Sequence, residues 1–259
     1  MSVAGIQISS LKAFLQTPEE ARRTFRRLAA MGCRVVQLQW LSPSLSPRWV
    51  ADALAEAGLT SVSTQDFTWQ VEKDWDTVVE MNRLCGSRHV CISGVPGEKL
   101  DRAACEALAE TSRRMVRALS GQGMVLSFHP RSREFAPMPG CPGRTVTDWL
   151  LEQVPEMMLG LDAFHAVRGG QDVPALLRRY EGRVDFVHCK DFVLENGAVR
   201  LRVLGEGCVD WPPIVAACRE TGVPWVFAEQ ETFAAGDDPF ACMARSFAYL
   251  QACGLQAGM

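Results

Sequence analysis

Residues 158–190 read MLGLDAFHAVRGGQDVPALLRRYEGRVDFVHCK and contain two short apolar runs with a helical pattern between them. The runs cover residues 158–162 and 184–190, and apolar side chains recur at helical spacing over residues 173–180. Parallel neighbours in a sheet need a crossover connection of about a dozen residues or more, usually a helix. The segment therefore predicts a parallel strand–helix–strand unit in which each strand ends in polar residues.

The same alternation of short apolar runs and longer helical patterns continues in both directions along the chain. The other candidate strands are residues 5–9, 34–39, 60–66, 89–93, 124–129 and 226–230. The other helical patterns are residues 17–31, 46–57, 74–84, 100–119, 147–153, 211–221 and 239–250. Eight strand–helix units in about 250 residues predict an α/β fold, a (β/α)8 TIM barrel that forms a single domain over residues 1–259. An open doubly wound sheet is the alternative, but no GxGxxG follows the first strand.

The composition excludes several classes of protein. The chain has 259 residues, 47% hydrophobic and 22% charged, with a mean hydropathy of −0.01, which is typical of a globular protein and not of a disordered one. A net charge of −3 and an isoelectric point near 5.9 give no basic field for nucleic acid or an anionic membrane. No apolar run approaches the ~18–20 residues of a membrane span, and the N-terminus lacks the pattern of a signal peptide. We therefore expect a cytoplasmic protein that binds neither nucleic acid nor membrane.

Polar side chains end four successive strands in the second half of the predicted barrel: His129, Asp162, His188 and Glu229. Because the functional groups of such barrels gather at the carboxyl ends of the strands, we expect these four to converge. Imidazole and carboxylate donors suit Mn²⁺, Co²⁺, Mg²⁺ or Zn²⁺, whereas the ten cysteines are scattered without a CxxC pair and do not indicate a thiolate site. A single Asp at a strand end is commonly only a helix cap. The hypothesis of a metal site therefore depends on all four side chains lying close together. His89 begins its strand at the opposite rim, which favours a structural role.

Four motifs then carry a resemblance to a known family. Residues 160–170, GLDAFHAVRGG, are similar to a DxxH…GG turn, and residues 183–191, RVDFVHCKD, to an RV…VHxKD strand. Residues 204–211, LGEGCVDW, are similar to an LGEGxVDW segment, and residues 128–135, FHPRSREF, to YHNHxxEF. Together they resemble the sugar phosphate isomerase/epimerase group, the xylose isomerase-like TIM barrels.

This resemblance implies an enzyme that acts on a small carbohydrate with the help of one divalent metal ion. It implies that the metal is held by Glu134, Asp162, His188 and Glu229. It places His129 and His165 at positions that contact substrate or support the ligands, and it places Lys190 and Glu206 along the pocket. A homo-oligomer is compatible with the family, but the sequence does not define one.

Two positions depart from the family pattern. The usual Asn-His after the first His of the motif is Pro130-Arg131, which removes an imidazole and adds a fixed cation. Arg131 therefore suggests a substrate with an anionic group, such as a carboxylate or phosphate, unless it pairs only with Glu134. Gln37 stands where the second strand of the family usually carries Glu, and a neutral amide cannot act as a base. We expect Gln37 to contact substrate instead.

The resemblance also implies a mechanism. A metal bound to adjacent carbonyl and hydroxyl oxygens would polarise the carbonyl and stabilise an enediolate, while Glu134 and Glu229 remove and return the proton. Return to the opposite face is epimerisation, and return to the next carbon is isomerisation of a sugar, keto-sugar or related polyol. Loss of a β-hydroxyl would be dehydration, the reaction of relatives that act on keto-inositols.

Two other functions are open alternatives to this mechanism. An endonuclease IV-like nuclease shares the barrel but needs more than four histidines and a basic face for DNA. A non-catalytic polyol-binding barrel that has lost a ligand would retain metal weakly, whereas the enzyme would hold nearly one ion per chain.

Overall fold

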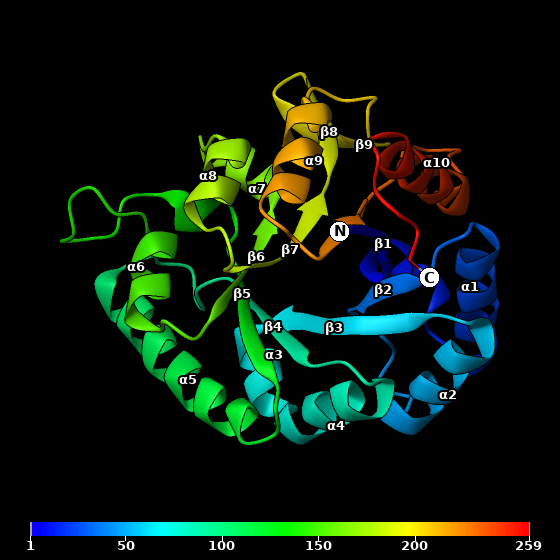
Figure 1. Cartoon of the computed structure of the whole chain (residues 1–259), viewed down its shortest axis with the longest axis horizontal. Helices are drawn as coiled ribbons and strands as arrows, with labels where there is room; N and C mark the ends of the chain where they lie inside the picture. The colour runs from blue at the N-terminus through cyan, green and yellow to red at the C-terminus, as the bar shows by residue number, and fades with distance from the viewer. Residues whose placement is uncertain (1, 259) are drawn as a thin grey trace.

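Eight parallel strands close into a barrel at the centre of the molecule, and helices surround it (Figure 1). The computed structural model describes residues 2–258. The barrel strands are β1 (Val3–Gln7), β2 (Val35–Leu38), β3 (Thr60–Phe67), β4 (His89–Ser93), β5 (Val125–His129), β6 (Met158–Asp162), β7 (Val184–Cys189) and β10 (Trp225–Ala228). They pair in the order β1-β10-β7-β6-β5-β4-β3-β2. The predicted TIM barrel is confirmed.

Within residues 2–258, seven of the ten α-helices begin at a residue whose side chain caps them. The helices are α1 (Pro18–Ala30), α2 (Pro47–Ala57), α3 (Thr68–Lys73), α4 (Trp75–Cys85), α5 (Arg102–Ser120), α6 (Val146–Gln153), α7 (Ala163–Arg168), α8 (Val173–Arg179), α9 (Trp211–Glu220) and α10 (Pro239–Ala252), with 3-10 turns η1 (Ile8–Phe14) and η2 (Ser132–Phe135). The Thr17 side chain accepts from Glu20 N at the start of α1, and Ser46 caps α2 in the same way. A proline follows each cap, where its missing N–H costs nothing. No helix within residues 2–258 combines the length and apolarity of a membrane crossing.

An antiparallel hairpin after β7 is the main departure from the predicted alternation. Its strands, β8 (Asp191–Glu195) and β9 (Ala198–Arg202), lie outside the barrel at the top of Figure 1. Asn196 and Gly197 form the turn with φ of 52° and 79°. Positive φ at both central positions is the requirement of a type I′ turn, which Asn-Gly satisfies. The dipeptide was the sequence signal for this hairpin, and the apolar pattern did not reveal it.

The barrel interior has an apolar end and a polar end. Val35, Cys91, Phe186 and Phe227 form a small apolar cluster inside the barrel. A Cβ at Gly160 would lie 2.4 Å from Cζ of Phe186, so the phenyl ring requires glycine there. The Phe186 ring stacks under His188 with 4.9 Å between ring centroids. Polar side chains therefore occupy the layers beyond this ring, towards the carboxyl ends of the strands.

We expect Asp66, near the end of β3, to make the free energy of unfolding depend on pH. Burial raises its pKa to about 6, nearby Asp74 acts in the same direction, and the Phe67 backbone N–H opposes both. Because this pKa exceeds the unfolded value, Asp66 favours the folded state below about pH 4 and loses that contribution as the pH rises through 6. We expect Asp66→Asn to raise the free energy of unfolding, by about 2 kcal/mol more at pH 8 than at pH 4. Urea unfolding at both pH values measures this, and a pH-independent difference would contradict it.

Candidate active site

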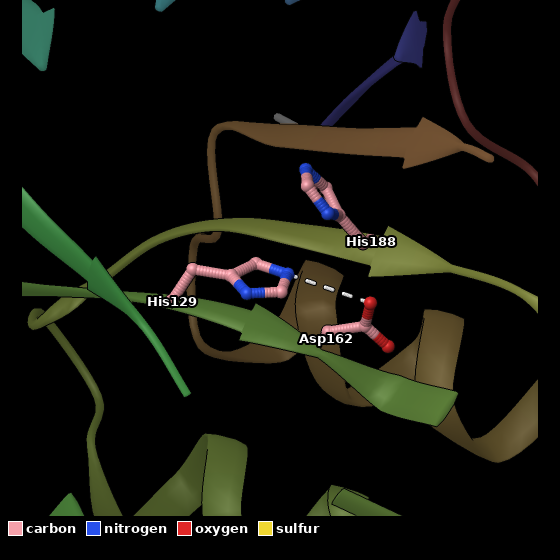
Figure 2. Close-up of side chains that lie close together, drawn as sticks. All are labelled: His129, Asp162 and His188. Atoms are coloured by element: carbon pink, nitrogen blue, oxygen red, sulfur yellow. Dashed lines mark ion pairs between the residues drawn. The ribbon is translucent and has the colours of Figure 1, made fainter. Parts of the chain in front are cut away.

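Four buried side chains meet at the carboxyl ends of β5, β6, β7 and β10. His129 and Asp162 are the last residues of β5 and β6, His188 lies in β7, and Glu229 follows β10 directly. We call these four residues the donor cluster, and each is at most 3% exposed. Figure 2 shows how the first three face one another, and one donor atom of each lies within 4.8 Å of the others. The predicted convergence of these four strand ends is therefore present in the fold.

The close contacts of the donor cluster run from one strand to the next. Nε2 of His129 lies 3.4 Å from Oδ2 of Asp162, the pair joined by a dashed line in Figure 2. Nδ1 of His188 lies 2.9 Å from Oε2 of Glu229. Lys190 Nζ bridges the two pairs, at 3.1 Å from Asp162 Oδ2 and 3.3 Å from Glu229 Oε2. The cluster and the lysine thus form one continuous charged group.

Each histidine of the donor cluster is anchored through one ring nitrogen. Nδ1 of His129 lies 3.1 Å from Oγ of Ser93. Nε2 of His188 lies 2.5 Å from Oε1 of Gln37, which also accepts from Nε2 of Gln7 at 2.7 Å. Because Gln37 Nε2 donates to Ser63 Oγ, its oxygen is left to accept from His188 Nε2, and Nδ1 is the ring atom that faces Glu229 Oε2. Metal-binding histidines are commonly held in this way by a partner of the second nitrogen.

Each carboxylate of the donor cluster is anchored through one oxygen. Oδ1 of Asp162 accepts from the backbone N–H of His165 at 3.0 Å, which caps α7. Oε1 of Glu229 accepts from Oγ of Ser9 at 3.1 Å. Asp162 is therefore a helix cap and a member of the cluster at once, since each role uses a different oxygen.

The remaining atom of each side chain fits a divalent metal ion. His129 Nε2, Asp162 Oδ2, His188 Nδ1 and Glu229 Oε2 are buried, and within residues 2–258 their polar contacts are ion pairs with one another and with Lys190, without a hydrogen bond. Buried polar atoms in proteins are almost always hydrogen-bonded, so four converging donor atoms that are held only by ion pairs need an explanation. Two imidazole nitrogens and two carboxylate oxygens are a donor set that Mn²⁺, Co²⁺ or Zn²⁺ accepts. The buried group of His129, Asp162 and His188 can hold a metal.

The charges of the site leave these donors in the protonation states that a metal requires. Burial would raise the pKa of Asp162, but the Lys190 ammonium and the nearby histidines hold it well below its usual range. Burial likewise opposes ionisation of Glu229, and the Lys190 ammonium nevertheless lowers its pKa to about 2. Burial lowers the pKa of His188. Near neutral pH the carboxylates are therefore charged and the His188 ring is neutral.

Lys190 is an ammonium ion and not a base. Burial alone would lower its pKa, but Asp162, Glu229 and Glu231 raise it. Glu231 Oε2 lies 3.4 Å from the nitrogen and completes its three carboxylate contacts. The sequence placed Lys190 along the pocket, and its nitrogen in fact lies against the donor cluster.

Two of the residues singled out in the sequence lie away from the donor cluster. Glu134 is buried, but its oxygens accept from Val95 N at 3.1 Å, Arg131 N at 2.8 Å and Arg133 Nε at 2.9 Å. Both of its oxygens are therefore occupied by the loop after β4 and by its own turn. Glu206 is exposed and pairs with Arg245. The ligand and catalytic roles of Glu134, and the pocket role of Glu206, stay predictions.

Of the other residues singled out in the sequence, Gln37 belongs to a buried hydrogen-bond network, and Arg131 and His165 line a cavity. Gln37 is fully buried and faces His188 instead of open solvent. Arg131 and His165 line a cavity of about 480 Å³ next to the cluster. Gln7, Ser9 and Ser93 were missed, although polar residues inside otherwise apolar strands were the signal, since burying them needs a partner.

Comparisons with known proteins agree with this architecture. The pattern that defines the xylose isomerase-like TIM barrel family matches residues 5–253. A sugar phosphate isomerase/epimerase structure from Parabacteroides distasonis is 20% identical, covers 98% of this chain and 94% of its own, and superposes with a TM-score of 0.82. An L-ribulose 3-epimerase structure is 16% identical, with coverages of 98% and 94% and a TM-score of 0.78. A 3-keto-D-glucoside 4-epimerase from E. coli is 15% identical, with coverages of 98% and 100% and a TM-score of 0.75.

One curated relative is closer in sequence over a shorter segment. An inosose dehydratase of Geobacillus kaustophilus is 35% identical over 104 residues. That match spans 33% of this chain and 34% of the relative, about a third of each. The solved structures establish the fold, and the family pattern covers nearly the whole chain. This chain belongs to the xylose isomerase-like TIM barrel family, which includes sugar isomerases, sugar epimerases and dehydratases.

Proposed function

We propose that this protein is a divalent-metal-dependent isomerase or epimerase of a sugar, keto-sugar or related polyol. The observation that carries the proposal is the convergence of four buried donor atoms, none of them hydrogen-bonded within residues 2–258, on four adjacent strand ends. We infer that His129, Asp162, His188 and Glu229 are the ligands, with His129 in the place that the family resemblance implies for Glu134. The donor types suit Mn²⁺, Co²⁺ or Zn²⁺.

The chain's own groups supply the proton transfer. A bound divalent metal would polarise the substrate carbonyl, which makes the hydrogen on the adjacent carbon acidic. Glu229, a carboxylate held by Ser9, takes that proton while the electron pair of the C–H bond moves towards the carbonyl oxygen. We assign the return of the proton to His165, because it lines the cavity and its ring packs against His129 at 5.8 Å between centroids. Return to the opposite face gives an epimer, and return to the neighbouring carbon gives an isomer.

Proton exchange tests this function directly. The metal-loaded protein is incubated in D₂O with keto-sugars, keto-inositols and their acids, and deuterium at the carbon next to the carbonyl is followed by NMR. We expect exchange with wild type, none with Asp162→Asn, and normal exchange with His89→Asn, whose histidine pairs with Asp185 at the opposite rim. Stoichiometric metal without exchange on any substrate would favour the non-catalytic polyol-binding barrel instead.

Dehydration is the second candidate, and one observation favours it. The relative with the highest sequence identity reported above is an inosose dehydratase. Dehydration begins with the same proton removal and continues with loss of a β-hydroxyl. The same assay separates the two reactions, because a dehydratase forms an unsaturated ketone and an epimerase returns a saturated sugar.

Gln37 provides a prediction about metal affinity. Its amide oxygen accepts the Nε2 proton of His188, so we expect Gln37→Met to free the imidazole to change tautomer. Loss of such a partner typically weakens metal binding ~10–100-fold. Gln37→Glu keeps the acceptor and should bind metal nearly as well as wild type. Calorimetric titration of metal-free protein with Zn²⁺ measures both. Ser63→Ala is the matched control, since Ser63 contacts Gln37 Nε2 and not His188.

Glu134 provides a prediction that separates the two ligand assignments. Glu134→Gln would place an amide N–H₂ against one of the three donors that now contact the carboxylate. We expect a loss of about 1–3 kcal/mol in the free energy of unfolding and an unchanged metal content. Urea unfolding and elemental analysis measure the two quantities. Unchanged stability with lost metal would show instead that Glu134 is a ligand.

A further inference from the structure

The charged side chains that line the cavity beside the donor cluster are all positive. The cavity measures about 480 Å³ and lies between the end of β3, the loop after β4 and the turn η2. Its charged lining residues are Arg131 and Arg133, and within residues 2–258 no carboxylate lines it. A cavity with cations and without acids favours an anionic occupant.

Arg133 is not available to such an occupant. Its Nε donates to Glu134 at 2.9 Å. Its Nη1 donates to the carbonyl oxygens of Gly97 at 2.9 Å and Glu98 at 3.1 Å, and its Nη2 donates to that of Val95. This arginine is therefore fixed to the loop after β4 and supports the cavity wall.

Arg131 is the available cation. Its guanidinium makes no ion pair or hydrogen bond within residues 2–258, and the pairing with Glu134 that was open from the sequence is taken by Arg133. Gly94 has φ of +67°, and a Cβ there would lie 3.2 Å from Cδ of Arg131. Glycine thus lets the arginine stem lie against the loop. The Phe67 ring lies 6.0 Å from Cζ, and the 56% exposed Trp69 adds an aromatic wall.

Two side chains that line the cavity, Ser93 and His165, also contact the donor cluster. Ser93 lines the cavity and lies 3.1 Å from His129 Nδ1. His165 also lines it, and its Nδ1 lies 3.0 Å from Oγ of Ser132. The cavity therefore lies directly beside the donor cluster, with His165 between the cluster and Arg131.

We propose that this cavity binds an anionic group of the substrate, a carboxylate or a phosphate, and that Arg131 is its counter-ion. The proposal rests on the proposed function, because it assumes that the other end of the substrate reacts at the donor cluster. The planar guanidinium matches both groups with paired N–H donors, and its position fixes which carbon faces the donor cluster. Arg131 is on this account the residue that selects a sugar acid or sugar phosphate over a neutral sugar.

Calorimetric binding of three probes to the protein as purified tests the proposal. D-gluconate carries a carboxylate, D-glucose 6-phosphate carries a phosphate, and D-glucitol is a neutral polyol of the same carbon number. We expect at least one anion to bind wild type about tenfold or more tightly than glucitol, the difference that one charge-assisted contact supplies. Arg131→Gln should bring that anion to within about twofold of glucitol. The stronger of the two anions identifies the group.

Lys99→Gln is the matched control, because it removes one exposed positive charge from the neighbouring loop without lining the cavity. An anion preference that survives in Arg131→Gln, or that Lys99→Gln removes equally, would overturn the proposal, as would equal binding of all three probes. Binding needs no turnover. Failure of the proton-exchange assay would therefore contradict the proposed function and leave this test intact.

Discussion

His188→Ala should abolish stoichiometric metal binding. Its Nδ1 is one of the four converging donor atoms and lies 2.9 Å from Glu229 Oε2. Loss of a partner outside the ligand set already weakens metal binding ~10–100-fold, and loss of a ligand should cost more. We expect about one Mn, Co, Zn or Mg ion per wild-type chain after dialysis, and almost none in the variant. Elemental analysis of both purified proteins measures this.

His89→Ala is the control for this experiment. His89 lies at the other rim, where its Nδ1 is 2.9 Å from Oδ1 of the buried Asp185. Its replacement should lower stability and leave the metal content unchanged. An equal metal content in His188→Ala and wild type would contradict the four-ligand assignment. Absence of metal from all three proteins, even after reloading, would remove the metal-assisted mechanism and support the polyol-binding alternative.

Lys190→Met should have the largest effect on stability. Its ammonium lies within 3.4 Å of Asp162, Glu229 and Glu231; Lys190, Asp162 and Glu229 are buried, and Glu231 is half-buried. Removing one partner of a buried charge group leaves the others uncompensated, at a cost of about 3–5 kcal/mol. We expect that loss in the free energy of unfolding measured in EDTA. Lys190→Arg keeps the charge and should lose less.

The same variant should bind metal at least as tightly as wild type. In Lys190→Met a divalent cation becomes the main positive charge available to Asp162 and Glu229, so the metal and the lysine stabilise the same oxygens. Added Zn²⁺ should therefore restore more stability to the variant than it adds to wild type. Denaturant unfolding with and without Zn²⁺ measures the difference. Weaker Zn²⁺ binding in the variant would mean that the lysine supports the metal and does not compete with it.

The strands were predictable because each is a short apolar run whose pattern depends on its own residues. β4 and β6 begin and end where the sequence predicted, and the other barrel strands shift by one or two residues. The hairpin β8–β9 was not predicted, because strands outside a core carry no continuous apolar pattern. The short helices α3 and α7 were missed for a related reason, since six residues hold less than two helical turns.

The sequence by itself determined which strand ends meet. Parallel strands of a closed barrel all end at one rim, so Asp162, His188 and Glu229 had to converge once eight strand–helix units were recognised. Tertiary structure decided the direction of individual side chains. Glu134 faces Val95 because the turn η2 rotates its carboxylate there, and Gln37 faces His188 because adjacent strands place both inside the barrel. A sequence motif predicts the position of a residue on the backbone. The direction of its terminal polar atoms depends on hydrogen-bond partners from distant strands and loops, and these partners cannot be predicted from the local sequence.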